Sequence, residues 1–186
     1  MTATREPTAL PDVVALIPPR FEDERGWFQP LLTPKDGEAL TGWTPFVQVN
    51  QSRSLRGVLR GMHLQTRRPQ GKLVQVTRGA IFDVAVDLRP DSPAFGRWAG
   101  QVLSAANRAA LWVPPGFAHG FYALEDADLL YLVTAPWDPG HELTLSWEDP
   151  TVGIEWPLRG DAQLSERDAA GVSLAQARRA LLAERR

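Results

Sequence analysis

Cysteine is absent from this chain of 186 residues, which excludes disulfide bonds, thiol catalysis and cysteine-bound zinc. No stretch approaches the roughly 18 apolar residues of a membrane-spanning helix, and no charged-then-apolar leader opens the sequence. The net charge of −2 gives no basic excess for nucleic acid. The composition therefore predicts one cytoplasmic domain with neither a nucleic-acid nor a membrane partner.

Lysine, histidine and tyrosine are scarce: the chain has two Lys, three His and two Tyr, compared with 18 Arg. His63, Lys72, His119 and Tyr131 nevertheless fall in the part of the sequence with the densest apolar alternation. A base, an ammonium and a phenol in one apolar cavity suit the movement of a proton on a carbon beside a carbonyl.

The chain divides into three parts by pattern. Residues 1–12 are polar with two prolines and predict a loose N-terminal arm. From residue 13 to about 170, short apolar stretches with period-two alternation are separated by Gly, Pro, Asn and Asp, which predicts an all-β sandwich or barrel. Residues 171–186 place Leu174, Ala177 and Leu181 near helical spacing, so we expect a C-terminal helix packed on this domain.

His63 and Gln65 share one face of a predicted strand. A His pair at that spacing, followed by an acid and by a later His after a Pro-x-Gly turn, forms the metal site of the β-barrels called cupins. Gln65 replaces the second His and no Glu lies within 66–72, so the ligands are too few for a metal. We expect no metal; the alternative for His63 is a hydrogen-bonded core histidine.

Other candidates also have plain alternatives. Lys72 either faces inward toward a ligand oxyanion or phosphate, or reaches water from a strand edge. Tyr131 is either an acid aimed at a carbanion or a core residue. Arg60, like Arg56, either clamps a diphosphate or is a solvated loop residue. Asp168 either orients His63 or is a surface acid.

The ordered motifs resemble those of the dTDP-4-dehydrorhamnose 3,5-epimerase family over roughly residues 13–170. They include Phe21-x-Asp23-x-Arg25-Gly26-x-Phe28, Gln48-x-Asn50-x-Ser52-Arg53-Ser54, Arg60-Gly61-Met62-His63-Leu64-Gln65, Pro69-Gln70-Gly71-Lys72, Pro114-Pro115-Gly116-Phe117-Ala118-His119 and Pro139-x-His141-Glu142. The resemblance implies a cupin-like jelly-roll β-barrel or sandwich, a homodimer with exchanged strands, and no metal or redox cofactor.

The resemblance also implies residue roles on a dTDP-4-keto-6-deoxy sugar. His63, paired with Asp168, would remove a proton beside the C4 ketone, Lys72 would stabilise the enolate oxygen, and Tyr131 would reprotonate the opposite face. The implied substrate contacts are Arg25, Phe28, Gln48, Asn50, Arg60, His119 and Trp137. Inversion of C3, and possibly C5, would follow.

Departures from the family pattern keep other functions open. Trp137 stands where the family has a second Tyr, and Pro30 stands where it has a Glu. The loss of pocket groups leaves a C3-only or C5-only epimerase as an alternative, with Trp137 obstructing the second inversion. Further alternatives are an isomerase that moves the ketone, a catalytically silent sugar-nucleotide binding protein, and a metal-dependent oxygenase disfavoured by Gln65.

Overall fold

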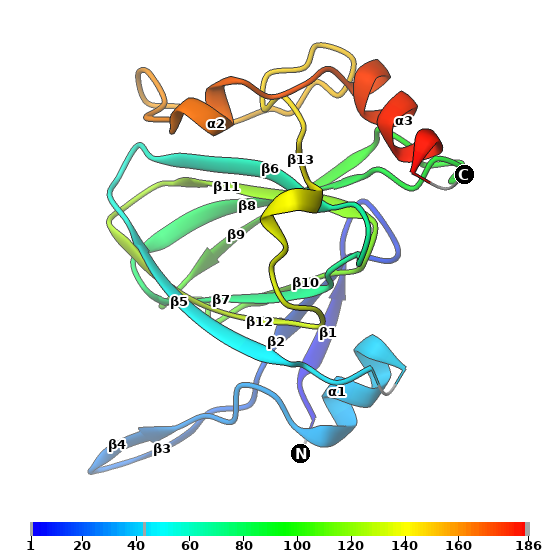
Figure 1. Ribbon diagram of the computed structural model, residues 1–186. Helices are drawn as coiled ribbons and strands as arrows, with labels where there is room; N and C mark the ends of the chain where they lie inside the picture. The colour runs from blue at the N-terminus through cyan, green and yellow to red at the C-terminus, as the bar shows by residue number, and fades with distance from the viewer. Residues whose placement is uncertain (1, 43, 185–186) are drawn as a thin grey trace.

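Figure 1 shows the computed structural model, which describes residues 2–42 and 44–184. Two antiparallel sheets lie face to face. The six-stranded sheet has the order β1 (Thr4–Pro7), β2 (Val14–Ile17), β10 (Ala110–Val113), β7 (Lys72–Arg78), β12 (Ala127–Val133) and β5 (Gln48–Ser54). The five-stranded sheet has the order β13 (Glu142–Thr144), β6 (Leu59–Gln65), β11 (Phe117–Ala123), β8 (Ala80–Asp87) and β9 (Trp98–Ser104). The predicted all-β class is confirmed.

The main core lies between the sheets and follows from period-two alternation. Val74 and Leu129 point inward from the six-stranded sheet and pack in one buried cluster with Phe117 and Phe121 of the five-stranded sheet. The alternate residues of β6 and β8 point outward, where Met62 and Val84 form a second buried cluster. His63 therefore faces the space between the sheets, because it alternates with Met62 and Leu64.

Helices cover the outer face of the five-stranded sheet (Figure 1). Helix α3 (Leu174–Ala183) begins after Ser173, which caps it, and buries Leu174, Ala177 and Leu181 in the second cluster. This is the short C-terminal helix expected from the apolar spacing. Helix α2 (Glu166–Ala169) lies beside β6, and the 3₁₀ turn η1 (Pro139–His141) leads into β13.

The N-terminal residues differ from the loose arm expected over 1–12. Residues 4–7 form β1, which pairs along its length with β2 because that strand otherwise leaves an unpaired edge. The Thr8 hydroxyl donates to the carbonyl groups of Leu10 and Val13, and Leu10 is buried. Strand β1 was not predicted because its side chains are polar and exposed, so the sequence has no apolar alternation there. Only its backbone is paired with the sheet.

A hairpin and a helix complete the N-terminal third. Strands β3 (Phe21–Asp23) and β4 (Gly26–Phe28) pair only with each other and project away from the sandwich (Figure 1). Helix α1 (Pro34–Thr41) follows a capping box in which Thr33 and Asp36 satisfy each other's backbone N–H groups. Phe21, Trp27 and Phe28 leave 41%, 61% and 67% of their surface exposed, so this hairpin carries apolar surface that the chain itself does not cover.

Candidate active site

A cavity of about 190 Å³ opens between the two sheets. Both sheets supply its walls, and helix α2 adds Arg167. The lining residues are Ser52, Arg60, His63, Lys72, Val74, His119, Gly120, Phe121, Leu129, Tyr131 and Arg167. The structure thus brings five sequence-predicted residues to one cavity: Arg60, His63, Lys72, His119 and Tyr131.

His63 is held by a carboxylate from the far end of the chain. Its Nε2 lies 2.6 Å from Oδ1 of Asp168, which is 4% exposed. Ser165 caps α2 and donates its hydroxyl to the other oxygen of Asp168. Burial would raise the pKa of Asp168, but the hydrogen bonds from His63 and Ser165 bring that pKa below its usual value. An ionised Asp168 fixes the Nε2–H tautomer of His63 and leaves Nδ1 free to accept a proton.

A second histidine lies opposite the first. His119 on β11 pairs in register with His63 on β6, so both rings occupy the same face of the sheet. His119 Nε2 lies 2.8 Å from Oδ1 of Asp83, which is fully buried. Close contact of the two strands depends on Gly61, because a Cβ there would lie 2.5 Å from the Cα of Gly120. Asp83 was not singled out from the sequence, although a charged residue inside the apolar run of β8 was a usable signal.

Lys72 and Tyr131 enter the cavity from the six-stranded sheet, opposite the two histidines. Burial lowers the pKa of Lys72 from 10.5 to about 8, although the charges of Glu142 and Asp83 oppose that fall. Burial raises the pKa of the Tyr131 phenol, and the charge of Arg60 offsets part of the rise. At neutral pH the cavity therefore holds an ammonium and a protonated phenol on the side opposite the two histidines.

A family model described as dTDP-4-dehydrorhamnose 3,5-epimerase matches residues 7–176. The chain belongs to this family. A Pseudomonas aeruginosa dTDP-4-dehydrorhamnose 3,5-epimerase is 49% identical over 95% of this chain and 98% of its own length. The protein of that name from Salmonella typhimurium is 47% identical over 91% of this chain and 94% of its own length.

Solved structures agree with the sequence relatives. The epimerase RmlC from Legionella pneumophila, in complex with dTDP-4-keto-L-rhamnose, has a TM-score of 0.92, 44% identity and 96% coverage of both chains. NovW, a 4-keto-6-deoxy sugar epimerase from Streptomyces spheroides, has a TM-score of 0.89 and 37% identity, covering 97% of this chain and 92% of its own. The predicted cupin-like fold and the predicted class of sugar-nucleotide epimerase are confirmed.

Four of the predicted contacts lie outside the cavity wall of the epimerase. Arg25 and Phe28 lie at the projecting hairpin, where Arg25 pairs with Asp23 and leaves 84% of its side chain exposed. Gln48 and Asn50 lie on the edge strand β5, where the Gln48 amide donates to Asn50. Asn50 pairs with Tyr131 across the sheet, so this face of β5 extends the cavity wall outward.

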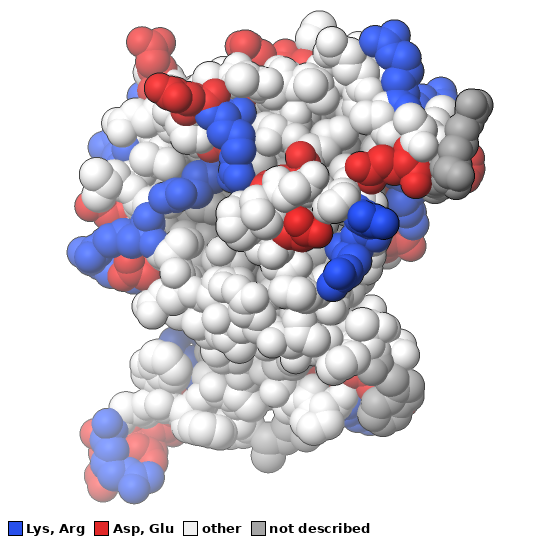
Figure 2. All heavy atoms as spheres, viewed as in Figure 1, with Lys and Arg blue, Asp and Glu red and all other residues white. Residues whose placement is uncertain are grey.

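The remaining predicted contact, Trp137, lies beside Glu142, which also binds Arg167. Neither Glu142 nor Arg167 was predicted as a site residue. The indole Nε1 of Trp137 donates to Oε2 of Glu142, at 2.7 Å, while 57% of Trp137 stays exposed. Arg167 donates to the same oxygen at 2.9 Å and also lines the cavity. Figure 2 shows basic side chains in a band beside α2 and β5. Glu142 belonged to a recognised motif, but only the fold shows what it contacts.

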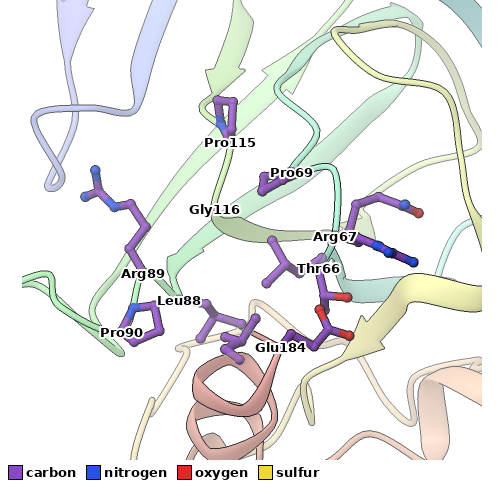
Figure 3. A pocket seen from close by; sticks show the side chains of 12 residues that line it. Thr66, Arg67, Pro69, Leu88, Arg89, Pro90, Pro115, Gly116 and Glu184 are labelled. Carbon is purple, nitrogen blue, oxygen red and sulfur yellow. The ribbon is translucent and has the colours of Figure 1, made fainter. Parts of the chain in front are cut away.

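A larger cavity of about 440 Å³ lies beneath α3 and is separate from this site. Figure 3 shows Leu88, Pro90, Pro115 and Pro69 around it, with Glu184 at its edge. None of the residues predicted to bind or transform the substrate lines it. Within residues 2–42 and 44–184, no three His, Cys, Asp or Glu side chains are grouped to hold a metal ion, and no helix there is long and apolar enough to cross a membrane.

Proposed function

We propose that this enzyme inverts C3 and C5 of a dTDP-4-keto-6-deoxyhexose. The observation that carries the proposal is the placement of the His63–Asp168 pair on one sheet and of Lys72 and Tyr131 on the facing sheet, around one cavity. A substrate ring between the sheets would have a base on one face and an acid on the other, which inversion at carbon requires.

The chemistry uses side chains alone. The C4 ketone makes the neighbouring C–H acidic, and Nδ1 of His63 takes that proton while the electron pair moves into an enolate. The Lys72 ammonium stabilises the enolate oxygen as its charge develops. Tyr131 then donates its phenolic proton to the opposite face of the carbon, so His63 ends with one proton more and Tyr131 with one fewer. Exchange with water restores both groups before the next inversion.

The higher sequence identity to 3,5-epimerases than to a monoepimerase favours inversion at both carbons. The 3,5-epimerases from Pseudomonas aeruginosa and Salmonella typhimurium are 49% and 47% identical to this chain. ChmJ, a 3′-monoepimerase from Streptomyces bikiniensis, is 32% identical, with a TM-score of 0.87 and coverage of 97% of this chain. Inversion of C3 alone is the competing outcome, and Trp137, whose indole donates to Glu142, is the residue we expect to cause it.

Two copies of the chain form the proposed working unit. Arg25 and Phe28 are expected to bind the substrate, yet their hairpin projects from the sandwich with exposed aromatic side chains. We propose that the hairpin of one protomer reaches the cavity of its partner, where Arg25 joins Arg60 at the diphosphate and Gln48 and Asn50 contact the sugar or nucleotide. The enzyme would act in the cytoplasm on a nucleotide-linked sugar.

Deuterium incorporation tests the reaction. The protein is incubated with dTDP-4-keto-6-deoxyglucose in deuterated water, and the labelled carbons are located by NMR. Label at C3 and C5 is expected, with no label in His63→Ala despite retained nucleotide binding. Label at one carbon would identify a monoepimerase. No label with normal binding would identify a silent binding protein and overturn the proposal.

Subunit mixing tests the exchanged hairpin. His63→Ala and Arg25→Ala homodimers should each have little activity. When the two are mixed and allowed to exchange subunits, one of the two sites in each heterodimer should contain both His63 and Arg25, and activity should return in part. If each hairpin served its own cavity, every site in the mixture would lack one group and activity would not return.

A further inference from the structure

Glu142 is a third carboxylate at the candidate active site, beside His63. Its carboxylate is 10% exposed and accepts hydrogen bonds through Oε2 from Trp137 and Arg167. Its other oxygen, Oε1, lies 3.8 Å from Nδ1 of His63. The negative charge of Glu142 also raises the pKa of Lys72, more than any other neighbouring charge does, and so opposes the lowering by burial. One acid therefore lies beside the proposed base and also favours the charged form of the proposed enolate-stabilising cation.

The two other carboxylates of the site have narrower roles. Asp168 binds Nε2 of His63, and Asp83 binds Nε2 of His119. When Nδ1 of His63 takes up a proton, its ring becomes a cation in a cavity that already holds Lys72 and Arg167. Glu142 lies on the Nδ1 side of this ring, whereas Asp168 occupies the Nε2 side.

We propose that Glu142 is a positioning residue whose carboxylate serves as the shared counter-ion of His63 and Lys72 during proton transfer. This inference rests on the proposed function. The imidazolium formed by proton abstraction is then flanked by carboxylates at both nitrogens. Lys72 stays charged for the enolate. Because little water screens these groups, their mutual attraction is stronger than at the surface.

The contact with Arg167 fits the same role. One terminal nitrogen of Arg167 lies 3.2 Å from Nε2 of His63, where its charge opposes the formation of an imidazolium. Its other terminal nitrogen is held by Glu142. Glu142 therefore offsets a neighbouring cation that would otherwise hinder the base, and it fixes the position of a group that lines the cavity.

Glu142→Gln is the decisive variant, because glutamine keeps the size and an acceptor oxygen but loses the charge. We expect kcat to fall about 10- to 100-fold, less than the roughly 10²–10³-fold typical of a lost direct contact to the transition state, with KM nearly unchanged. The basic limb of the pH profile should move to lower pH, since Lys72 loses its largest favourable charge. Glu142→Asp, which keeps the carboxylate, should retain that limb.

Trp137→Phe is the matched control. It removes the indole hydrogen bond to Glu142 but leaves the carboxylate, so the basic limb should stay near that of the wild-type protein. A shift of the basic limb equal to that of Glu142→Gln would mean that Glu142 only tethers the indole, and it would overturn the proposal. An unchanged kcat and basic limb in Glu142→Gln would overturn it as well.

A titration without turnover separates this inference from the proposed reaction. The chain has only two lysines, so ¹³C-labelled Lys72 is assigned in NMR spectra by comparison with Lys35→Arg. Glu142→Gln should lower the Lys72 titration midpoint by about one pH unit, and Glu142→Asp should not. The charged or titratable groups around Lys72 that remain the same are Asp83, Arg60, Arg167, His63, His119 and Tyr131. An unmoved midpoint would refute the counter-ion role even if deuterium labelling succeeds; a moved midpoint would support it even if labelling fails.

Discussion

Lys72→Met should stabilise the folded protein at pH 7 while removing its activity. Burial lowers the pKa of Lys72 from 10.5 to about 8. At about 1.4 kcal/mol per pKa unit, this difference costs the folded state about 3 kcal/mol. The unfolded chain binds the Lys72 proton more tightly than the folded protein does. The wild-type free energy of unfolding should therefore rise between pH 8 and 10.5, with the full cost present below pH 8.

Urea unfolding from pH 7 to 10.5, at one protein concentration, measures this difference. Lys72→Met should exceed the wild-type protein by up to about 3 kcal/mol at pH 7, and the excess should shrink as the wild-type ammonium deprotonates. Lys35→Met, at an exposed position of α1, should show no such change. A Lys72→Met protein that is less stable at pH 7, or whose excess is independent of pH, would refute the argument that function keeps a costly buried charge here.

Three further variants test separate parts of the site. Tyr131→Phe should still exchange substrate protons with deuterated water but form little inverted product, because the acid of the opposite face is missing; NMR of product configuration distinguishes the two, and normal inversion would exclude Tyr131 as the acid. Gly61→Ala should lose about 2 kcal/mol or more in urea unfolding, whereas Gly26→Ala, which has a similar φ but no atom within 4 Å of its added Cβ, should lose less; equal losses would exclude steric contact as the cause. If the wild-type protein labels C3 alone, Trp137→Tyr should give deuterium at C5 as well as at C3. An unchanged label pattern would show that the indole does not prevent inversion at C5.

The cavity wall was largely predictable from the sequence because strand alternation is local. His63, Lys72 and Tyr131 each follow the period of their own strand, so the neighbours that share a face with each could be read without a fold. Whether Lys72 points into the cavity or to water stayed open until the two sheets were placed. Asp168 was predicted only through the family resemblance, since no local pattern joins it to a residue 105 positions earlier. Its contact with His63 is a matter of tertiary structure, as are the contacts of Asp83 and Glu142.

Elements with polar side chains were harder to predict. Residues 4–7 are exposed on their side chains and form β1 solely through backbone pairing with β2, which composition does not register. The hairpin residues Arg25 and Phe28 carry a motif typical of substrate binding, yet they lie away from the cavity of their own chain. A single sequence gives residue types and local spacing, but it does not state which copy of the chain a residue serves.

The hydrogen bond between His63 and Asp168 also bears on the order in which the active site is assembled during synthesis. His63 lies on β6, whereas its partner lies 105 positions later, in α2. During synthesis from the N-terminus, both sheets can assemble before α2 leaves the ribosome. A nascent chain that stops before α2 would then have a walled cavity whose base lacks its orienting acid. Catalytic competence would arrive only with α2, so turnover reports the synthesis of that helix more stringently than ligand binding does.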